Sequence, residues 1–489
     1  MNESSQETVI VGAGFAGLFT ALHLRHRKYS PSIILIEPQD RFVFKPMLFE
    51  RLTDELDQDT VCPSYEELLQ GSEIVLIKDH VVGLDLKQNQ ITLASGKKHS
   101  YSYLVLAVGS IQGYRGTQGA PENVFPFRTQ DNMLILKKHL QDCLQQASQS
   151  KNEQYRKALL TFTIVGAGPS GVEMAATLAD LLPHWYAKLG GNIHEIRLIL
   201  VNHGQSILGG DINEHLQHVA LDAFRKRIIP VELLLGVSVK SVWKDALDYQ
   251  ASHSEQVESI HTHTTIWTAG TANNSLIEML KDQIAPENLN KHGLPIVSST
   301  LQLLDFPNVF GAGDCVEVKG NKQPAIAQVA YQQGADIAHN LIAISSGKKL
   351  RSSDVKLRGT LMKLGLGNGV ANLFDKVQIE GKPGDLIRNV TYLEMLPTPL
   401  HNFKATVDWL KNETFYHYSR KDLADQLEKD VKPQMTPVQK KNYAIVKGLS
   451  IIAPIVFIVA TYIALKTPPR EKIRIDQTKA NPSLIKKMP

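Results

Sequence analysis

The N-terminal part of the chain shows a pattern of apolar and polar positions that predicts a strand, a helix and a second strand. Residues 8–11 form an apolar, mainly β-branched run, which is typical of a buried strand. A glycine-rich phrase follows at 12–17, and residues 18–27 have a helix-like pattern. The second strand is predicted at 33–36 and leads to Glu37. Together these segments make a complete βαβ unit.

The glycines of this phrase and the acid that follows have the spacing of a dinucleotide-binding site. Gly12 permits the tight turn, Gly14 lets the backbone approach a pyrophosphate, and Gly17 lets the helix pack closely on the strand. The start of the helix then faces the phosphates. Glu37 lies 20 residues after Gly17, where a carboxylate accepts hydrogen bonds from a ribose.

The same phrase occurs a second time. Residues 162–165 are apolar, Gly166, Gly168 and Gly171 repeat the glycine spacing, and a strand is predicted at 196–201. A protein that holds one dinucleotide as resident cofactor and binds another as diffusing substrate needs two such units. We therefore expect a flavoprotein with non-covalent FAD and a nicotinamide donor. The alternative is a degenerate repeat kept for packing.

Three later strands end at residues suited to contact a nucleotide. One predicted strand leads to Gly109 and another to Gly270, each after its own βαβ unit, and a small residue there lets the chain pass close to a ligand. A third strand, after the second unit, delivers Asp314, a candidate for holding the ribityl or pyrophosphate part of FAD. The predicted fold class is α/β, with two Rossmann-like dinucleotide-binding domains, the second inserted in the first.

The C-terminal part contains an uncharged apolar run at 448–465, an 18-residue stretch that is the shortest length normally read as a membrane span. Basic residues flank it on both sides, where long side chains reach the headgroups. We predict one transmembrane helix at 444–466, followed by a basic polar tail at 467–489. The alternative is a buried core helix, but that would need a domain around it.

Composition and cysteine usage exclude several classes. The net charge of +4, from 53 basic and 49 acidic side chains, is too small to make a nucleic-acid-binding surface by itself. Cys62, Cys143 and Cys315 form no CxxC pair, so dithiol chemistry and iron–sulfur clusters are not expected, and no metal-ligand cluster is evident. The first residues show no secretory signal, so we expect the catalytic part to lie in a reducing cytosol.

Further motifs indicate which group of flavoproteins the chain resembles. Residues 327–334 read Ala-Gln-Val-Ala-Tyr-Gln-Gln-Gly, and matching phrases occur at 41–49, 171–173 and 267–270. Over about residues 8–415 the chain resembles the type II NAD(P)H:quinone oxidoreductases, a group within the two-dinucleotide-binding-domain flavoproteins. Within that group it is most similar to the membrane-anchored cyanobacterial enzymes.

This resemblance implies a function and roles for three residues. The implied reaction carries two electrons from NADH or NADPH through FAD to a membrane quinone of plastoquinone, menaquinone or ubiquinone type, without proton pumping. Gln328 and Gln332 lie four residues apart and share a helical face, from which their amides would contact the quinone. Glu173 corresponds to a glutamate near the flavin and nicotinamide that is a candidate for proton supply, and it also suits a helix N-terminus.

The resemblance also implies a domain order and a location. Catalytic domains on the cytoplasmic face of a plasma or thylakoid membrane, a single pass near the C-terminus and a homodimer are all compatible with it. The predicted divisions are 1–130 and 281–345 for the FAD domain, the second part carrying the quinone-site helix, 155–280 for the NAD(P)H domain, and 346–430 for a membrane-associating region.

Asn202 departs from the family pattern. It stands where NADH-preferring enzymes of the group have an acid that binds the ribose 2′-hydroxyl and repels a 2′-phosphate. Strict use of NADH is therefore not expected. Residues 182–193 add extra helix and loop before this strand, which leaves the register of Asn202 open by one residue.

Three rival functions share most of these features. A sulfide:quinone reductase needs a redox-active cysteine pair, which the three cysteines do not provide in any recognisable form. A biosynthetic reductase of a demethylated naphthoquinone, in phylloquinone formation, would have a nearly identical sequence. The third is a redox-sensing flavoprotein that binds NAD(P)H with little turnover, and the intact glycines and the quinone-site phrase favour catalysis over it.

Overall fold

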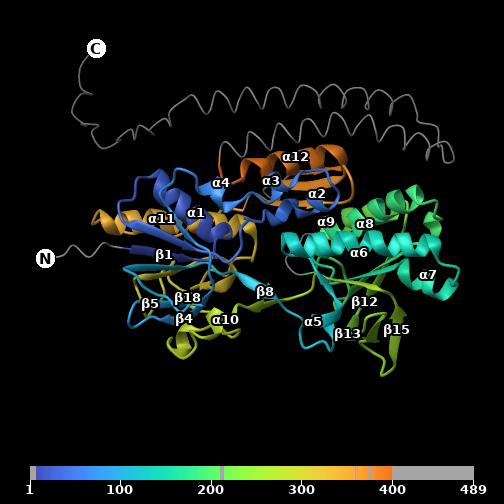
Figure 1. The fold of residues 1–489 in the computed structure, drawn as a ribbon, viewed down its shortest axis with the longest axis horizontal. Helices are drawn as coiled ribbons and strands as arrows, with labels where there is room; N and C mark the ends of the chain where they lie inside the picture. The colour runs from blue at the N-terminus through green and yellow to red at the C-terminus, as the bar shows by residue number, and fades with distance from the viewer. Residues whose placement is uncertain (1–6, 210–213, 358, 374–376, 399–489) are drawn as a thin grey trace, which may run out of the picture. The chain divides into compact units, whose positions relative to one another are not determined.

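Two parallel sheets of five strands form the framework of the protein (Figure 1). The computed structural model describes residues 7–209, 214–357, 359–373 and 377–398. The first sheet has the order β19-β7-β1-β2-β3. Its strands are β1 (Glu7–Val11), β2 (Ser32–Ile36), β3 (Val75–Ile77), β7 (Tyr103–Leu106) and β19 (Val309–Gly311).

The second sheet is formed by residues that lie between β7 and β19 in the sequence. Its order is β12-β11-β10-β16-β9, with all neighbours parallel. Its strands are β9 (Phe125–Pro126), β10 (Thr161–Val165), β11 (Arg197–Asn202), β12 (Val231–Leu235) and β16 (Thr264–Trp267). Because β19 returns to the first sheet after the second is complete, the second α/β unit is inserted in the first, as predicted.

Small antiparallel sheets cover and connect these units. They are β4 (Val81–Asp85), β5 (Gln90–Leu93) and β6 (Lys98–Ser100); β13 (Val237–Val242), β14 (Ala246–Ala251) and β15 (Val257–His261); β21 (Gly359–Lys363), β22 (Gly369–Leu373) and β23 (Val377–Glu380); β8 (Ser110–Gln112) with β17 (Thr271–Asn273). The remaining pair, β18 (Ile296–Val297) with β20 (Glu317–Val318), is parallel.

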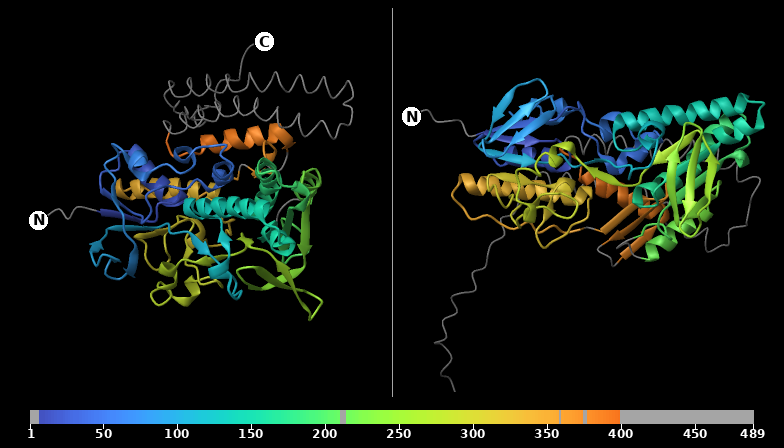
Figure 2. Two further views of the ribbon diagram at one scale, coloured as in Figure 1. Left: turned by 45° about the vertical axis from the view of Figure 1, so that its right-hand side comes forward. Right: turned by 90° about the horizontal axis from the view of Figure 1, so that it is seen from below.

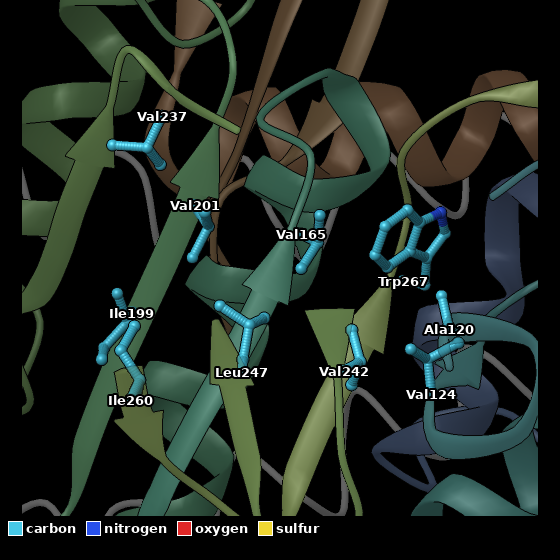
Figure 3. Close-up of a cluster of buried hydrophobic side chains, with 10 residues drawn as sticks. All are labelled: Ala120, Val124, Val165, Ile199, Val201, Val237, Val242, Leu247, Ile260 and Trp267. Atoms are coloured by element: carbon cyan, nitrogen blue, oxygen red, sulfur yellow. The ribbon is translucent and has the colours of Figure 1, made fainter. Parts of the chain in front are cut away.

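One apolar core lies between the second sheet and the antiparallel sheet of β13 to β15 (Figure 3). Val165, Ile199 and Val201 come from the parallel strands, while Val242 and Leu247 come from the antiparallel ones. All five side chains are buried, and burial of an aliphatic side chain contributes about 1.5–3 kcal/mol. This packing fixes the ends of β10 and β11, where the second nucleotide phrase begins.

The helices α1 (Phe15–His26) and α11 (Ala327–Ser345) pack against each other. Thr20 donates a hydrogen bond to the carbonyl of Gly334 at 3.1 Å, and the rings of Phe19 and Tyr331 meet edge-on with centroids 4.5 Å apart. The quinone-site phrase predicted at 327–334 is therefore helical and lies beside the helix that follows the first glycine phrase.

The other helices flank the sheets, and Figure 2 shows α12 along the sheet of β21 to β23. They are α2 (Leu48–Leu52), α3 (Gln58–Val61), α4 (Tyr65–Leu69), α5 (Ala120–Asn123), α6 (Gln130–Gln149), α7 (Glu153–Leu159), α8 (Pro169–Lys188), α9 (Glu214–Arg225), α10 (Ser275–Glu278) and α12 (Gly381–Glu394). Short 3-10 turns are η1 (Lys45–Met47), η2 (Ile193–Glu195), η3 (Pro286–Asn288) and η4 (Gly313–Cys315). The extension of α8 to Lys188 matches the extra helix expected before Asn202.

The predicted membrane helix at 444–466 and the polar tail lie outside the described residues. Of the helices that the structure describes, none combines the length and apolar character needed to cross a bilayer.

Candidate functional site

The first glycine phrase has the geometry that a bound pyrophosphate requires. Gly12 has φ +91°, and a Cβ there would lie 2.6 Å from the carbonyl oxygen of Ala107. A Cβ on Gly17 would collide with the carbonyl of Gly12, so the close contact of helix and strand needs glycine at this position. A Cβ on Gly14 would meet open space, which leaves room for a ligand at the start of α1.

Glu37 closes this site from the end of β2. Its Oε2 accepts a hydrogen bond from the amide of Ala13 at 2.8 Å, and its Oε1 accepts one from the amide of Gln39 at 3.2 Å. Burial raises the pKa of this carboxyl group, and the two amides oppose the rise. Both oxygens keep further lone pairs, so the carboxylate fits the two hydroxyls of a ribose.

Asp314 lies in η4, directly after β19, and belongs to a polar group that sequence reasoning found only in part. Ser110 donates a hydrogen bond to Asp314 Oδ2 at 2.8 Å, and Arg128 donates to the Ser110 carbonyl at 2.8 Å. The amide of Gly313 donates to Gln333 Oε1 at 2.7 Å. Gln333 stands inside the phrase at 327–334, which was the available signal for it, whereas Arg128 gave none.

Lys45 adds a cation near Arg128 and Asp314. Its side chain is exposed at the surface but has many protein atoms around it. The partial loss of hydration, together with the nearby Arg128 guanidinium, lowers the pKa of its ammonium group to about 8. Two cations beside one carboxylate favour a phosphate-bearing ligand at the first sheet.

The second glycine phrase repeats the first in geometry. Gly166 has φ +104°, a Cβ on Gly171 would collide with the carbonyl of Gly166, and a Cβ on Gly168 would meet open space. The helix α8 begins directly after Gly168, with Pro169 at its first position. Two cradles of the same construction are therefore present, and the residues fit two dinucleotides.

Asn202 occupies in the second cradle the place that Glu37 has in the first. Its Oδ1 accepts a hydrogen bond from the amide of Ala167 at 3.2 Å, as Glu37 does from Ala13. This match fixes the register that the sequence left open. The Asn202 Nδ2 donates to the carbonyls of Gly204 at 3.2 Å and Ser206 at 2.9 Å, so both amide hydrogens are used within the chain.

Gly109 directly precedes β8, and Gly270 directly precedes β17, the strand that pairs with β8. Both have positive φ, +61° and +74°, and a Cβ on Gly109 would meet open space. Gln112, at the end of β8, links this strand to the start of β17, because its side-chain amide donates a hydrogen bond to the Gly270 carbonyl at 3.1 Å. The antiparallel pair therefore connects the regions of the two cradles.

Gln328 and Gln332 share a face of α11, as predicted, but their amides have different surroundings. The buried Gln328 donates to the carbonyl of Gly359 at 3.2 Å. Gln332 donates to the carbonyl of Lys356 at 3.0 Å and accepts from the Lys356 amide at the same distance. Gln332 thus holds the chain that leads into β21, and its contact with a quinone stays a prediction.

Glu173 lies in the first turns of α8, beside the second cradle. Its Oε1 accepts a hydrogen bond from the amide of Lys363 at 2.8 Å and lies 3.8 Å from a guanidinium nitrogen of Arg388. Burial raises the pKa of this carboxyl group to about 7, against the effect of Arg388 and the Lys363 amide. A group with this pKa holds or releases a proton near neutral pH, as a general acid must.

A buried set of charged groups next to Glu173 was missed by sequence reasoning, and we call it the ion cluster. It consists of Glu50, Glu55, Lys363, Asp385 and Arg388. Lys363 Nζ lies 2.6 Å from Glu55 and 3.1 Å from Glu50, and Arg388 lies 2.6 Å from Glu50. Burial disfavours every charge here, but Arg388 and Lys363 outweigh it at Glu50 and lower the pKa of that carboxyl group.

The structure describes all three cysteines, and none of them forms a disulfide. Cys62, Cys143 and Cys315 are buried and unpaired, and burial raises the pKa of each thiol. No group of three or more potential metal ligands occurs among the described residues.

Known proteins of similar sequence and fold agree with this geometry. The chain is 28% identical to the demethylphylloquinone reductase of Synechocystis sp., covering 84% of this chain and 100% of that protein. It is 29% identical to the type II NADH:quinone oxidoreductase of Mycobacterium tuberculosis, covering 69% and 73%. The structure of NDH2 from Plasmodium falciparum in complex with NADH has the same fold, with a TM-score of 0.75 at 19% identity and coverage of 84% and 98%.

The resemblance that the motifs indicated is thereby confirmed. Residues 6–334 match the family described as pyridine nucleotide-disulphide oxidoreductase, and this match spans more than half of the chain. By that match, and by the two cradles that carry it, the chain belongs to the pyridine nucleotide-disulphide oxidoreductase family.

Proposed function

We propose that the protein is an NAD(P)H:quinone oxidoreductase with resident, non-covalent FAD, which passes two electrons from NADH or NADPH to a membrane quinone. The observation that carries the proposal is that the two ends of the short strand β21 are hydrogen-bonded to Gln328 and to Glu173. The residue that begins β21, Gly359, accepts from Gln328, and the residue that ends it, Lys363, donates to Glu173. An extended strand of this length spans about 13 Å. The predicted quinone residue and the predicted proton donor are therefore tied to one element.

The residues of the first cradle would hold FAD. Gly14 and the start of α1 would face its pyrophosphate, Glu37 its adenosine ribose, and the group of Asp314 and Arg128 the remainder of the chain. FAD, when bound, accepts a hydride and passes electrons to a second acceptor. The protein supplies position and electrostatics, and no pumping device is part of the proposal.

The residues of the second cradle would hold the nicotinamide nucleotide, with Gly168 at the pyrophosphate and Gly270 near the β8–β17 pair. Glu173, in the same helix, would then lie between donor and acceptor sites. Its carboxyl group, with a pKa of about 7, would supply a proton to a quinone oxygen as the quinone is reduced.

Donor choice gives a testable prediction for Asn202. Replacement by Asp places a negative charge where a 2′-phosphate would lie, while keeping an oxygen for the Ala167 amide. We expect Asn202→Asp to lower kcat/KM for NADPH about tenfold or more, with a smaller effect on NADH. Steady-state kinetics with both donors measures this ratio.

The matched control is Asn152→Asp, the same change at an exposed asparagine that caps α7 and belongs to neither cradle. It should leave the ratio of the two donors unchanged. An unaltered ratio in Asn202→Asp would show that this position does not face the 2′ position of the nucleotide.

A second candidate function is reduction of a demethylated naphthoquinone in quinone biosynthesis. It is favoured by the similarity to the Synechocystis demethylphylloquinone reductase, all of whose length is covered. Turnover on a demethylated naphthoquinone and on short-chain plastoquinone, menaquinone and ubiquinone analogues distinguishes the two. A kcat/KM at least tenfold higher for the demethylated compound would assign the protein to quinone biosynthesis.

Membrane attachment is part of the proposal and rests on the sequence. The helix at 444–466 would anchor the chain, with region 346–430 at the bilayer surface and the catalytic part on the cytoplasmic face. Extraction at alkaline pH tests it, since an anchored chain stays with the membrane pellet. Release of all the protein would contradict the anchor.

A further inference from the structure

The overall reaction creates a need for protons that the two cradles do not meet. In NAD(P)H + Q + H⁺ → NAD(P)⁺ + QH₂, the nicotinamide supplies a hydride, and one further proton comes from water in each turnover. Glu173 can deliver that proton, but its own side chain is only 13% exposed. A buried proton donor that works repeatedly must be recharged from solvent.

The ion cluster lies next to Glu173 and extends toward solvent. Arg388 is 2.6 Å from Glu50 and 3.8 Å from Glu173, and Lys363 bridges Glu50 and Glu55. Glu50 is 3% exposed, whereas Glu55 is 20% exposed. Carboxyl groups and cations therefore alternate from a partly exposed position to the delivery group.

Charge balance indicates that this region retains protons. Four carboxyl groups, those of Glu50, Glu55, Glu173 and Asp385, share two buried cations, so full ionisation would leave two uncompensated negative charges. The groups that face one another come from every element packed here: Glu50 on α2, Glu55 after it, Glu173 on α8, Lys363 on β21, and Asp385, Arg388 and Tyr392 on α12. Burial raises the pKa of Asp385 to about 6, despite Lys363 and Arg388.

Two oxygens in the cluster lack a partner among the described residues. Glu50 Oε2 and Asp385 Oδ1 are buried without a hydrogen bond there. A buried polar atom of this kind is normally satisfied by an internal water molecule. Such waters would connect the carboxyl groups and let protons move between them.

We propose that the ion cluster is the proton supply of Glu173, with Glu55 as its solvent end and Asp385 as its middle, while the ionised Glu50 pairs with Lys363 and Arg388. Lys363 and Arg388 hold the carboxyl groups in place and do not themselves release protons. In each cycle a proton enters at Glu55, passes through Asp385 and recharges Glu173 after it has protonated the quinone oxygen. This inference rests on the proposed function.

Glu55→Gln tests the relay because it preserves the shape of the side chain but cannot carry a proton. With the full chain and bound FAD, stopped-flow measures flavin reduction by NADPH and reoxidation by a short-chain quinone separately. We expect reoxidation to slow about tenfold or more and reduction to change less than about twofold. Added formic acid should restore part of the lost rate, which a purely structural defect would not allow.

Two variants control for folding and charge. Glu55→Asp keeps the carboxyl group and should retain most of the reoxidation rate. Glu153→Gln removes one partner of an exposed ion pair with Lys157 and should behave as the unaltered chain. Wild-type reoxidation in Glu55→Gln, or an equal loss in both half-reactions, would overturn the relay. Failure of the unaltered chain to be reoxidised by quinone would instead overturn the proposed function.

A second readout needs no turnover. The raised pKa of Asp385 means that the folded state binds this proton more tightly than the unfolded state, so its contribution to stability is lost as pH rises through about 6. The change Asp385→Asn should therefore reduce the fall in Tm between pH 5 and pH 8, measured by calorimetry. An unchanged fall would show that Asp385 does not retain a proton in the folded protein.

Discussion

Replacing Gln328 by Leu is expected to slow reoxidation of the reduced protein by quinone about tenfold or more, while reduction by NADH or NADPH changes less than about twofold. Gln328 is buried on α11, and its amide donates to the Gly359 carbonyl at the start of β21. Leucine has a similar volume but offers no amide to a quinone carbonyl. The loss should therefore fall on one half-reaction, which stopped-flow absorbance of the flavin separates from the other.

The matched control is Gln145→Leu, the same change at an exposed helical position on α6. It should leave both half-reactions as they are. An equal loss in both steps for Gln328→Leu would assign this residue to the structure of α11, and an unaltered reoxidation rate would remove it from the quinone site.

The change Arg388→Met is expected to lower the free energy of unfolding by about 3–5 kcal/mol. The Arg388 side chain is fully buried, contacts Glu50 at 2.6 Å and donates to the carbonyl of Pro46 at 2.6 Å. Its removal leaves the Glu50 carboxylate buried with only the Lys363 ammonium, at 3.1 Å, to balance its charge among the described residues. Denaturant unfolding followed by circular dichroism measures the loss.

An exposed pair provides the comparison. Arg197 forms a two-pronged contact with Glu232, and both side chains are about half exposed, so Arg197→Met should cost less than about 1 kcal/mol. Adding Glu50→Gln to Arg388→Met should recover part of the loss, because the uncompensated charge is then absent. Similar costs for the two arginine changes would contradict a stabilising role for the buried pair.

The sequence was sufficient to predict the two cradles because each is built from local signals. Gly12 and Gly166 turn the chain, and Glu37 and Asn202 each end the next strand and accept a hydrogen bond at the same place. The insertion of the second unit was predictable for a similar reason, since Asp314 follows a strand that comes after the second phrase.

The ion cluster could not be predicted in this way. Glu50 is separated from Lys363 by 313 residues and from Arg388 by 338, and neither partner stands in a recognisable motif. Lysine and arginine in a sequence are normally taken as surface residues, because their burial requires partners that only the fold supplies. The same holds for Arg128, which reaches Asp314 through Ser110.

The central claim is that the two cradles and the face of α11 together carry electrons from a nicotinamide nucleotide to a quinone. Anaerobic stopped-flow of the full, detergent-solubilised chain with bound FAD tests it most directly. We predict fast flavin bleaching with NADH or NADPH, followed by fast recovery of the flavin absorbance on mixing with a short-chain plastoquinone analogue. Bleaching without recovery by plastoquinone, menaquinone or ubiquinone analogues would contradict the claim.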